Sequence, residues 1–372
     1  MTAVYLDHAA SSPIPDVVRE AMLPWLAGGF GNPSSVHGLG RAARHAVEAA
    51  RGEVAGLLGC AEEEVIFTSG GTESNYLAIA GMSGPVVTVA TEHDAVLQPA
   101  RQSGRPLTIL EPNPAGRVEA DDVVPAVERE ALVSVMLVNN ELGTVNPVPE
   151  LAAAVHAKGG FLHTDAVQAP AWTDVNIPDL GADLVSLSGH KIGGPKGCGV
   201  LVARRGVPLN PPSVGGGQER NRRGGTENVP AIVGMATAMR WQYGLGAGRA
   251  DRLERLKAAL RRGLAAALGD AVDFNSPEAG VAPHILNVRV PGVSPQEGSE
   301  MLILGLDLEG VAVSAGSACS SGSLNAGHVL GAIGRGDAAA IRYSLGWSTN
   351  EQDIDRAIEA TARVVERVLA VT

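Results

Sequence analysis

The sequence predicts an α/β fold, in which helices cover both faces of a mostly parallel sheet. Short β-branched runs alternate with alanine- and glycine-rich amphipathic segments along the whole chain. Polar, glycine-rich segments follow several of these runs directly, and ligands of such sheets gather at the carboxyl ends of the strands. The chain has 372 residues, and at roughly 150 residues per domain this length favours two domains.

Seven strands are expected in the first two thirds of the chain, because each is a short apolar run with β-branched residues. They are Val65–Thr68, Val86–Val89, Leu107–Leu110, Val133–Val138, Phe161–Thr164, Leu184–Ser188 and Val200–Ala203. Helices are expected in most of the gaps, among them Arg41–Leu58, Ser74–Ala80 and Glu150–Lys158. A long helical stretch, Val229–Leu268, is interrupted at Gly244–Gly248 and leads toward a second domain.

The second domain is expected to begin near Arg252 and to mix strands with helices. The pattern predicts strands at His284–Val290, Val311–Ser314 and Ile341–Ser344, and a helix at Glu297–Leu306. Thr349–Gln352 has the spacing of a capping box, which predicts the start of a last helix there.

Composition and charge exclude several classes of protein. The formal net charge is −11, and the one basic cluster, Arg220–Arg223, is more typical of a loop or a subunit contact than of a nucleic-acid site. No apolar run approaches the ~18 residues of a membrane span, and no leader pattern is recognisable. We therefore expect a soluble, cytoplasmic protein without direct nucleic-acid or membrane binding. Three scattered cysteines make neither a disulfide framework nor a zinc site.

Lys191 is the most informative residue of the chain. It lies in the glycine-rich segment Ser186–Gly199, directly after a predicted buried strand. Buried surroundings disfavour the ammonium form and so favour a nucleophilic amine. Such a lysine most often forms a Schiff base with pyridoxal phosphate (PLP). The alternative is a lysine beside a purely structural glycine turn.

Other strand ends carry residues that suit the same cofactor. Thr68–Asn75 follows a strand and opens a helix, so Gly70, Gly71 and Thr72 are candidates to wrap a phosphate, unless this is a plain glycine turn. Asp165 follows another strand, where it either holds a pyridinium nitrogen protonated or caps a helix. His93 is a candidate to stack on the cofactor ring and pass protons. The amides of Val138–Glu141 suit a phenolic oxygen or a substrate carboxylate.

Cys319 and Arg342 stand out in the second domain. Cys319 lies among small residues, Ser314–Ser323, which is typical of an accessible loop, although a small buried hydrophobe is the alternative. Cys60 and Cys198 are predicted to be packing residues. Arg342 is a charge within a strand-like segment, and an amino-acid substrate would offer it a carboxylate in bidentate geometry.

Together these segments resemble the cysteine desulfurases, PLP enzymes of the class-V aminotransferase family, over essentially the whole chain. The resemblance is carried by Tyr5–Ala10, Phe30–Ser35, Phe67–Ser74, Val138–Glu141, His163–Asp165, Ser188–Lys191, Gly215–Arg220, Gly224–Thr226, Gly316–Cys319 and Ile341–Gly346. It implies the fold type I of PLP-dependent transferases, with a large domain at residues 14–250. Residues 1–13 and 251–372 would form a smaller α+β domain that carries the cysteine loop.

The resemblance also implies a role for each site residue. Lys191 would bind PLP covalently, Asp165 would pair with the pyridinium nitrogen, His93 would stack on the ring, and Gln168 would contact the ring hydroxyl. Gly71, Thr72, Ser188 and His190 would hold the phosphate, with Thr226 contributed by the other subunit of a homodimer. Asn139 and Arg342 would bind the substrate carboxylate. Cys319 would attack the substrate sulfur and hold it as a persulfide. Only a thiolate does this efficiently, so the thiol would need a lowered pKa or a base such as His93.

The implied reaction converts L-cysteine to L-alanine and passes the sulfur to an acceptor protein. Its destination stays open among iron–sulfur cluster assembly, tRNA thiolation, thiocofactors and DNA phosphorothioation. The chain departs from the family pattern at Cys198, where the family commonly has an apolar residue, and at the small residues Gly322 and Ala326–Gly327, and these departures do not identify the acceptor. Alternatives are a selenocysteine lyase or small-amino-acid aminotransferase of the same fold, a non-catalytic scaffold, and a protein that modifies nucleic acid directly.

Overall fold

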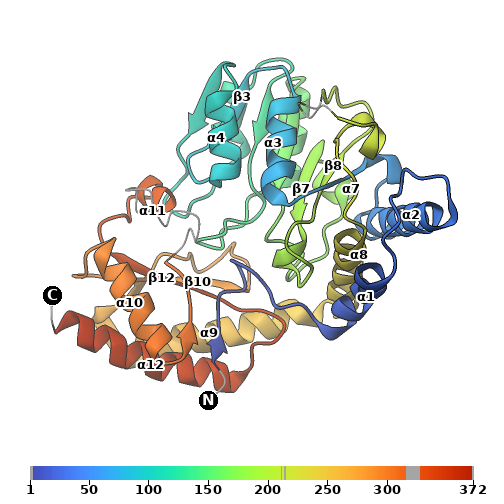
Figure 1. Ribbon diagram of the computed structural model, residues 1–372. Coiled ribbons are helices and arrows are strands. Elements are labelled where there is room, and N and C mark those ends of the chain that lie inside the picture. The colour runs from blue at the N-terminus through green and yellow to red at the C-terminus, as the bar shows by residue number, and fades with distance from the viewer. Residues whose placement is uncertain (1–2, 211, 213–214, 316–326, 371–372) are drawn as a thin grey trace.

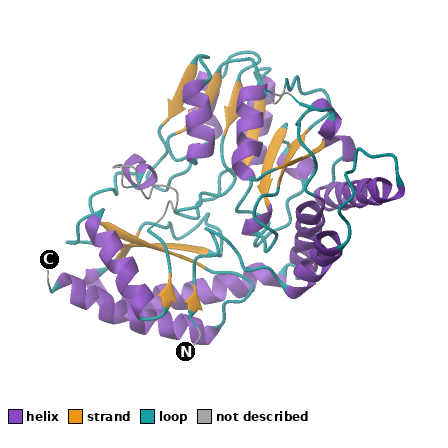
Figure 2. Cartoon of the chain, in the orientation of Figure 1, coloured by secondary structure: helices purple, strands orange, loops and turns teal. Residues whose placement is uncertain are grey.

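A computed structural model describes residues 3–210, 212, 215–315 and 327–370. Within these residues a seven-stranded sheet with helices on both faces forms the larger part (Figure 1). A three-stranded sheet backed by long helices forms the smaller part, which holds both ends of the chain (Figures 1 and 2). The α/β class and the mixed, mostly parallel sheet that the sequence predicts are confirmed.

The large sheet has the strand order β2-β8-β7-β6-β5-β3-β4. Its strands are β2 (Val65–Thr68), β3 (Val86–Val89), β4 (Leu107–Leu110), β5 (Leu132–Ser134), β6 (Phe161–Asp165), β7 (Leu184–Ser188) and β8 (Gly199–Ala203). β8 pairs antiparallel with β2 and with β7, and the remaining pairs are parallel. The carboxyl ends of β2 and of β3 to β7 therefore meet along one edge, where the predicted polar segments lie.

All seven predicted strands are present, but β5 is shorter than the expected Val133–Val138. The cause lies in the buried Glu92, whose carboxylate accepts a hydrogen bond from the Met136 backbone N–H at 2.5 Å. That N–H is lost to the ladder, so the regular strand ends at Ser134. β6 is instead one residue longer than predicted, because it continues past Thr164 to include Asp165.

Alternate residues of the strands pack into separate hydrophobic clusters on the two faces of the sheet. In β2, Ile66 packs with α3 and α4, whereas Val65 and Phe67 pack with helices of the opposite face. The first face is covered by α3 (Gly71–Gly81) and α4 (Asp94–Gln102). The other carries α1 (Asp16–Ala27), α2 (Gly38–Leu58), α6 (Val148–Ala157) and α8 (Val229–Gly244).

The smaller part is built on β9 (Asp273–Phe274), β10 (Ile285–Val290) and β12 (Ala339–Ser344), with β10 in the centre of an antiparallel sheet. Its helices are α9 (Gly248–Leu268), α10 (Glu297–Leu308) and α12 (Glu351–Leu369). β1 (Val4–Tyr5) pairs in parallel with β11 (Val311–Ala312), which ties the N-terminal segment to this part. The domain limits at residues 14–250 stay a prediction.

Two helix boundaries that the sequence predicts can be compared with the structure. The predicted interruption at Gly244–Gly248 is present, since α8 ends at Gly244 and α9 begins at Gly248. The capping box of the last helix lies one residue later than predicted, because the N-cap is Asn350 and its partner is Asp353. Thr349 instead accepts a hydrogen bond from the Gly346 N–H through its hydroxyl.

Short elements complete the described chain. They are α5 (Ala120–Val123), α7 (Ile177–Leu180), α11 (His328–Ala332) and the 3-10 segments Glu62–Glu64, Val124–Ala126, Gly189–Lys191, Gln218–Asn221 and Gly269–Ala271. None of the helices in the described ranges combines the length and the hydropathy that crossing a membrane requires.

Candidate active site

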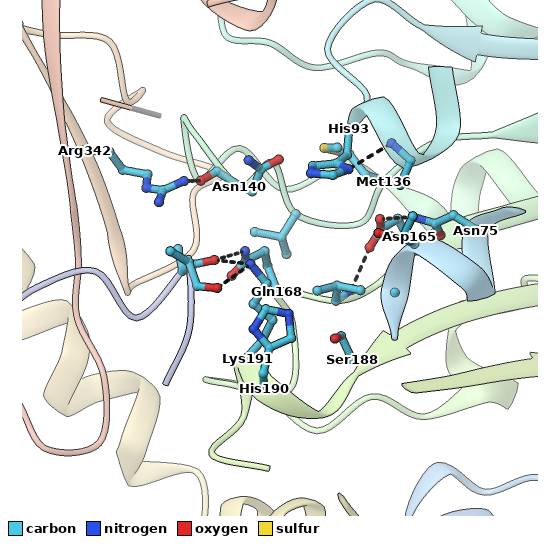
Figure 3. Close-up of a pocket in the computed structure, with 17 residues that line it drawn as sticks. Asn75, His93, Met136, Asn140, Asp165, Gln168, Ser188, His190, Lys191 and Arg342 are labelled. Carbon is cyan, nitrogen blue, oxygen red and sulfur yellow. Dashed lines mark hydrogen bonds between the residues drawn. The ribbon is translucent and has the colours of Figure 1, made fainter. Parts of the chain in front are cut away.

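A pocket of about 180 Å³ lies at the carboxyl edge of the large sheet, where it faces the smaller part (Figure 3). Its lining includes Gly71, Thr72, Asn75, His93, Asn140, Asp165, Gln168, Ser188, His190, Lys191 and Arg342. A second cavity of about 300 Å³ shares Gly71, Thr72, Ser188 and His190 and adds Glu73 and Lys196. Most of the residues predicted from separate segments therefore line one pocket.

Lys191 ends the 3-10 segment that follows β7, and its ammonium group is half-buried in the pocket. Its Nζ donates hydrogen bonds to the carbonyl oxygens of Ala9 at 2.6 Å and Ala10 at 3.0 Å. The turn around it is tight, because a Cβ on Gly189 would lie 3.0 Å from the Pro195 oxygen and one on Gly194 would lie 2.9 Å from the Gly189 oxygen. Glycine at these two positions is what lets the lysine leave a buried strand and enter the pocket.

One end of the pocket is suited to a phosphate. α3 begins at Gly71, and Gly71 and Thr72 of its first turn line the pocket, after Gly70, whose φ of 153° favours glycine. Across from them, Ser188 Oγ and His190 Nδ1 are buried and have no hydrogen-bond partner among the described residues. A Cβ on Gly71 would lie 3.0 Å from Val167 Cγ2, so the space there is kept free of side chains. The donors fit an anion with several oxygens.

His190 is uncharged at neutral pH. Burial, together with the nearby ammonium groups of Lys191 and Lys196, lowers its pKa from 6.5 to about 4. It therefore acts as a neutral donor or acceptor at the phosphate end, where the positive charge comes from the two lysines. Lys196 is an exposed cation in the glycine-rich segment and lines the second cavity. Lys196 is not among the site residues predicted from the sequence.

Asp165 lies at the end of β6, where both of its carboxylate oxygens are engaged. Oδ1 accepts from the Val167 N–H at 2.9 Å, and Oδ2 accepts from Asn75 Nδ2 at 2.6 Å. The helix-cap alternative for Asp165 is wrong, because a turn and not a helix follows β6. Asp165 caps that turn and also lines the pocket, so the ring-nitrogen role stays a prediction. Asn75 was missed by the sequence analysis. Its signal is the spacing from Thr72, which puts both on one face of α3.

His93 is the N-cap residue of α4 and lies across the pocket from Lys191 and His190 (Figure 3). Its Nδ1 accepts a hydrogen bond from the Ala95 N–H at 3.0 Å, which assigns the ring proton to Nε2. Burial lowers the pKa of His93, and Asp165 opposes that shift. The neutral ring therefore presents a flat face and an Nε2–H donor to the pocket, which suits stacking better than proton abstraction.

Gln168 and Arg342 mark the end of the pocket that faces the smaller part. Gln168 Nε2 donates to the Ala9 oxygen at 2.9 Å. Arg342 is a residue of β12 and only 1% exposed, with Nη1 donating to the Asn140 oxygen at 3.0 Å and Nη2 to Asp7 Oδ1 at 2.9 Å. Its Nε is buried and has no partner among the described residues. This fits a guanidinium held ready for a carboxylate.

Asn139 and Thr226 do not line the pocket of their own chain. Asn139 is fully buried, with Nδ2 donating to the Thr91 oxygen at 3.0 Å and Oδ1 accepting from the N–H groups of Glu141 and Leu142. Both ends of its amide are used to shape the turn, and its neighbour Asn140 lines the pocket instead. Thr226 is exposed.

Cys319 lies outside the described residues. The residues that flank its segment are anchored at the pocket: Ser314 pairs with Arg342 through two backbone hydrogen bonds, and His328 Nε2 donates to the Glu92 oxygen beside His93. The other two thiols are poor nucleophiles, because burial raises the pKa of Cys60 to about 11 and that of Cys198 to about 12. Neither of them lines the pocket.

Two histidines close to Asp165 in the sequence, His156 and His163, have side-chain partners within the protein. His163 is fully buried between the hydroxyls of Ser134 and Ser186, at 2.8 and 3.0 Å. His156 contacts Asp183 at 2.8 Å, at the amino end of β7 and away from the carboxyl edge. No group of histidine, cysteine and acidic side chains within the described ranges is arranged to hold a metal ion.

Comparisons with known proteins place the chain in a family. The model of the class-V aminotransferases matches residues 4–357. A protein named putative cysteine desulfurase IscS 1 from Bacillus subtilis is 40% identical, over 99% of this chain and 100% of the relative. The cysteine desulfurase IscS of Dictyoglomus turgidum is also 40% identical, over 99% and 96%.

Solved structures agree with these relatives. A NifS-like protein superposes with a TM-score of 0.89 at 32% identity, over 98% of this chain and 100% of that one. A cysteine desulfurase from Thermococcus onnurineus superposes with a TM-score of 0.86 at 27% identity, over 98% and 95%. With the family model and full-length relatives in agreement, the chain belongs to the class-V aminotransferase family and, within it, to the cysteine desulfurases.

Proposed function

We propose that the protein uses PLP to convert L-cysteine to L-alanine and carries the sulfur as a persulfide on Cys319 to an acceptor protein. The observation that supports this best is the joint arrangement at the pocket. The lysine of the glycine turn, the carboxylate of Asp165 and the free Nε of Arg342 line one space, and both flanks of the segment with Cys319 are anchored beside it.

The residues present fit PLP, which is the cofactor of this family. Lys191 would bind it covalently, and Asp165 would face its ring nitrogen with Asn75 holding the carboxylate. Gln168 would donate to the ring hydroxyl and His93 would lie against the ring. The N-terminus of α3 with Ser188 and His190 would hold the phosphate, which satisfies the two buried atoms that lack partners. When bound, PLP supplies an electron sink that stabilises negative charge at the substrate Cα.

The chain's own residues orient L-cysteine and move its protons. Arg342 would take the substrate carboxylate through Nε and Nη, and Asn140, rather than Asn139, is the amide placed to assist. The Lys191 amine would accept the proton from Cα, since its Nζ already lies inside the pocket against the Ala9 and Ala10 carbonyls. Protonation of the substrate Cβ after sulfur leaves completes alanine.

The sulfur step needs a thiolate. The Cys319 thiolate would attack the sulfur of the substrate, forming an S–S bond while the C–S bond breaks and its electron pair returns to the substrate carbon. No external oxidant is needed, because the carbon that gains the pair is reduced as the sulfur is oxidised. Cys319 lies five residues after Ser314 in the sequence, and Ser314 pairs with Arg342, which lines the pocket.

A homodimer is part of the proposal. Large apolar side chains are exposed on α1 and on the segment that follows it: Leu26 is 64% exposed, Phe30 81% and Val36 87%. Apolar surface of this kind favours a protein contact. Thr226 is exposed and lies away from its own pocket, so a role in phosphate binding would require the partner's pocket. A cytoplasmic location and the identity of the sulfur acceptor remain predictions.

The test measures sulfide and alanine from L-cysteine in the presence of a reductant, for the PLP-loaded protein and for Cys319→Ala. We expect equimolar products from the first and a loss of about a thousandfold or more in the variant, because the nucleophile is gone. Cys60→Ala is the matched control and should keep full activity. An equal loss of sulfide and alanine formation in both variants would contradict the role of Cys319 as the sulfur acceptor.

The same assay separates the alternative functions. Activity that is retained in Cys319→Ala with selenocysteine but not with cysteine would favour a selenocysteine lyase. Transfer of the amino group to a keto acid, without sulfide, would favour an aminotransferase. Bound PLP absorbance without turnover of any amino acid would favour the scaffold.

A further inference from the structure

The segment Gln218–Arg223 has an unusual backbone that the proposed function does not explain. Three consecutive residues other than glycine adopt left-handed conformations: Glu219 has a φ of 46°, Arg220 of 55° and Asn221 of 64°. Such conformations are rare outside glycine and persist only where the surroundings hold them. What holds this turn is therefore informative.

Glu219 anchors the turn in the interior. Its side chain is 2% exposed, and its carboxylate accepts hydrogen bonds from Arg51 Nη1 at 2.8 Å, from Arg51 Nη2 at 2.9 Å and from the Phe67 backbone N–H at 2.9 Å. Arg51 is itself buried, donates to the Val65 oxygen at 2.9 Å and lies over the Phe67 ring. A bidentate pair with these additional bonds is well satisfied.

Glu219 accepts its backbone hydrogen bond from β2, the strand that leads into residues 69–72, which we call the phosphate turn. β2 is an edge strand of the large sheet, and Phe67 presents its N–H on the open side. Two residues later, the Ser69 N–H donates to Glu73 Oε2 at 2.5 Å. Two carboxylates therefore fix the backbone immediately before Gly70 and Gly71.

Glu73 also has an arginine partner in the same segment. Arg223 Nε donates to Glu73 Oε1 at 2.9 Å, and both side chains are about a fifth exposed, at 23% and 22%. Burial alone would raise the pKa of Glu73, but hydrogen bonds from Arg223 and Ser69 outweigh it and lower the pKa. Glu73 is thus an anion that lines the second cavity, beside the place where a phosphate would lie.

The remaining arginines of the cluster bind the segment to its surroundings. Arg220 Nη1 donates to the Glu62 oxygen at 2.9 Å, and Arg222 donates to the Glu63 oxygen. The basic cluster that the sequence analysis singled out is therefore used within the chain, on the acidic segment Glu62–Glu64 and on the phosphate turn.

We propose that Glu219 with Arg51 and Glu73 with Arg223 are positioning residues for the cofactor phosphate, an inference that rests on the proposed PLP site. The first pair fixes the end of β2. The second pair fixes the turn and neutralises an acid that would otherwise repel the phosphate. Neither pair touches the ring portion of the pocket, so their effect is specific to the phosphate.

The test compares the binding of PLP and of pyridoxal, which has no phosphate, to the apoprotein, followed by cofactor absorbance. For Arg223→Gln we expect the dissociation constant of PLP to rise about tenfold, because the Glu73 charge is no longer neutralised. The constant for pyridoxal should stay within about twofold. The double variant Arg223→Gln with Glu73→Gln should recover most of the loss. Glu219→Gln should weaken PLP selectively as well.

Controls decide between positioning and a general structural role. Glu53→Gln removes the ion pair between Glu53 of α2 and Arg240 of α8 at the surface. It should change neither the dissociation constant of PLP nor that of pyridoxal. Thermal unfolding of each apoprotein checks the fold, and Arg223→Gln serves if Glu219→Gln does not fold. Equal weakening of PLP and pyridoxal, or no weakening, would overturn the positioning role alone. Failure of the unchanged protein to bind PLP would overturn the proposed function as well.

Discussion

The two ends of the pocket are built in different ways. At the phosphate end, Gly71 and Thr72 lie shortly after β2, Ser188 ends β7 and His190 follows it, so one sheet edge supplies these four residues. At the substrate end, Arg342 comes from the sheet of the smaller part, and its partners are Asp7 and the Asn140 carbonyl. One end is made by a single layer, and the other by three segments that are distant in sequence.

This difference separates two kinds of recognition. In the proposed site, backbone N–H groups and a neutral histidine would bind the phosphate, where the chain itself is fixed by glycine turns. At the substrate end, recognition would depend on one guanidinium held by an ion pair. Substitutions at the two ends should therefore affect different constants: cofactor affinity at the first, and the KM for L-cysteine at the second.

Arg342→Ala should give the largest effect at the substrate end. We expect the KM for L-cysteine to rise about a hundredfold, because a charge-assisted bidentate bond to the carboxylate is lost. The dissociation constant of PLP should change little. Steady-state kinetics and cofactor titration of the same preparation measure both.

Arg342→Lys should recover little of the KM, since lysine does not reproduce the bidentate fork. Arg289→Ala on the neighbouring strand β10 is the matched control, because Arg289 pairs with Asp273 and Asp337 away from the pocket. An equal loss of PLP affinity in Arg342→Ala would contradict the separation of the two ends.

Asn140→Ala should give a smaller effect in the same direction. A single amide contact to the carboxylate predicts a rise in KM of about tenfold with little change in thermal stability. Asn139→Ala should instead lower the thermal stability and change the KM little. It leaves the Glu141 and Leu142 N–H groups without their acceptor inside a buried turn. Thermal unfolding beside kinetics distinguishes them, and a larger KM effect in Asn139→Ala would reverse the assignment.

The same contrast explains what the sequence could predict. Lys191, Gly71 and Asp165 each follow a strand inside a contiguous motif, so local pattern was sufficient to select them. Asn75 and Asp7 act through contacts that join residues 90 and 335 positions apart, and no local pattern encodes these. Asn139 and Asn140 are adjacent amides, and only the turn, in which Asn139 accepts two backbone N–H groups, decides which of them faces the pocket.

The fold shows the same limit. The strands and the break at Gly244–Gly248 were predictable from periodicity and glycine, because these signals are local. The early end of β5 was not, because it depends on a buried acid, Glu92, that reaches across from the loop after β3. Burial raises the pKa of Glu92 well above its usual range, and sequence alone gives no sign of that environment.

Acid sensitivity gives the smallest predicted effect and tests whether the large sheet and the smaller part unfold together. His163 lies in β6 of the large sheet, and His284 lies just before β10 of the smaller part. Both are fully buried, and burial lowers each pKa from 6.5 to about 3. The unfolded chain therefore binds more protons than the folded chain between these values, so stability is present above pH 6.5 and is lost as pH falls toward 3.

For each histidine the loss on going from pH 7.5 to 5.5 is about 1.4 kcal/mol, or roughly 2 °C in Tm for a chain of this size. His163→Gln and His284→Gln should each reduce the fall in Tm between these pH values by that amount, whatever their effect at pH 7.5. His45→Gln, on the exposed face of α2, should leave the fall unchanged. In a single transition, a variant that leaves the fall unchanged would contradict the lowered pKa of that histidine. Two separate transitions would show that the large sheet and the smaller part unfold independently.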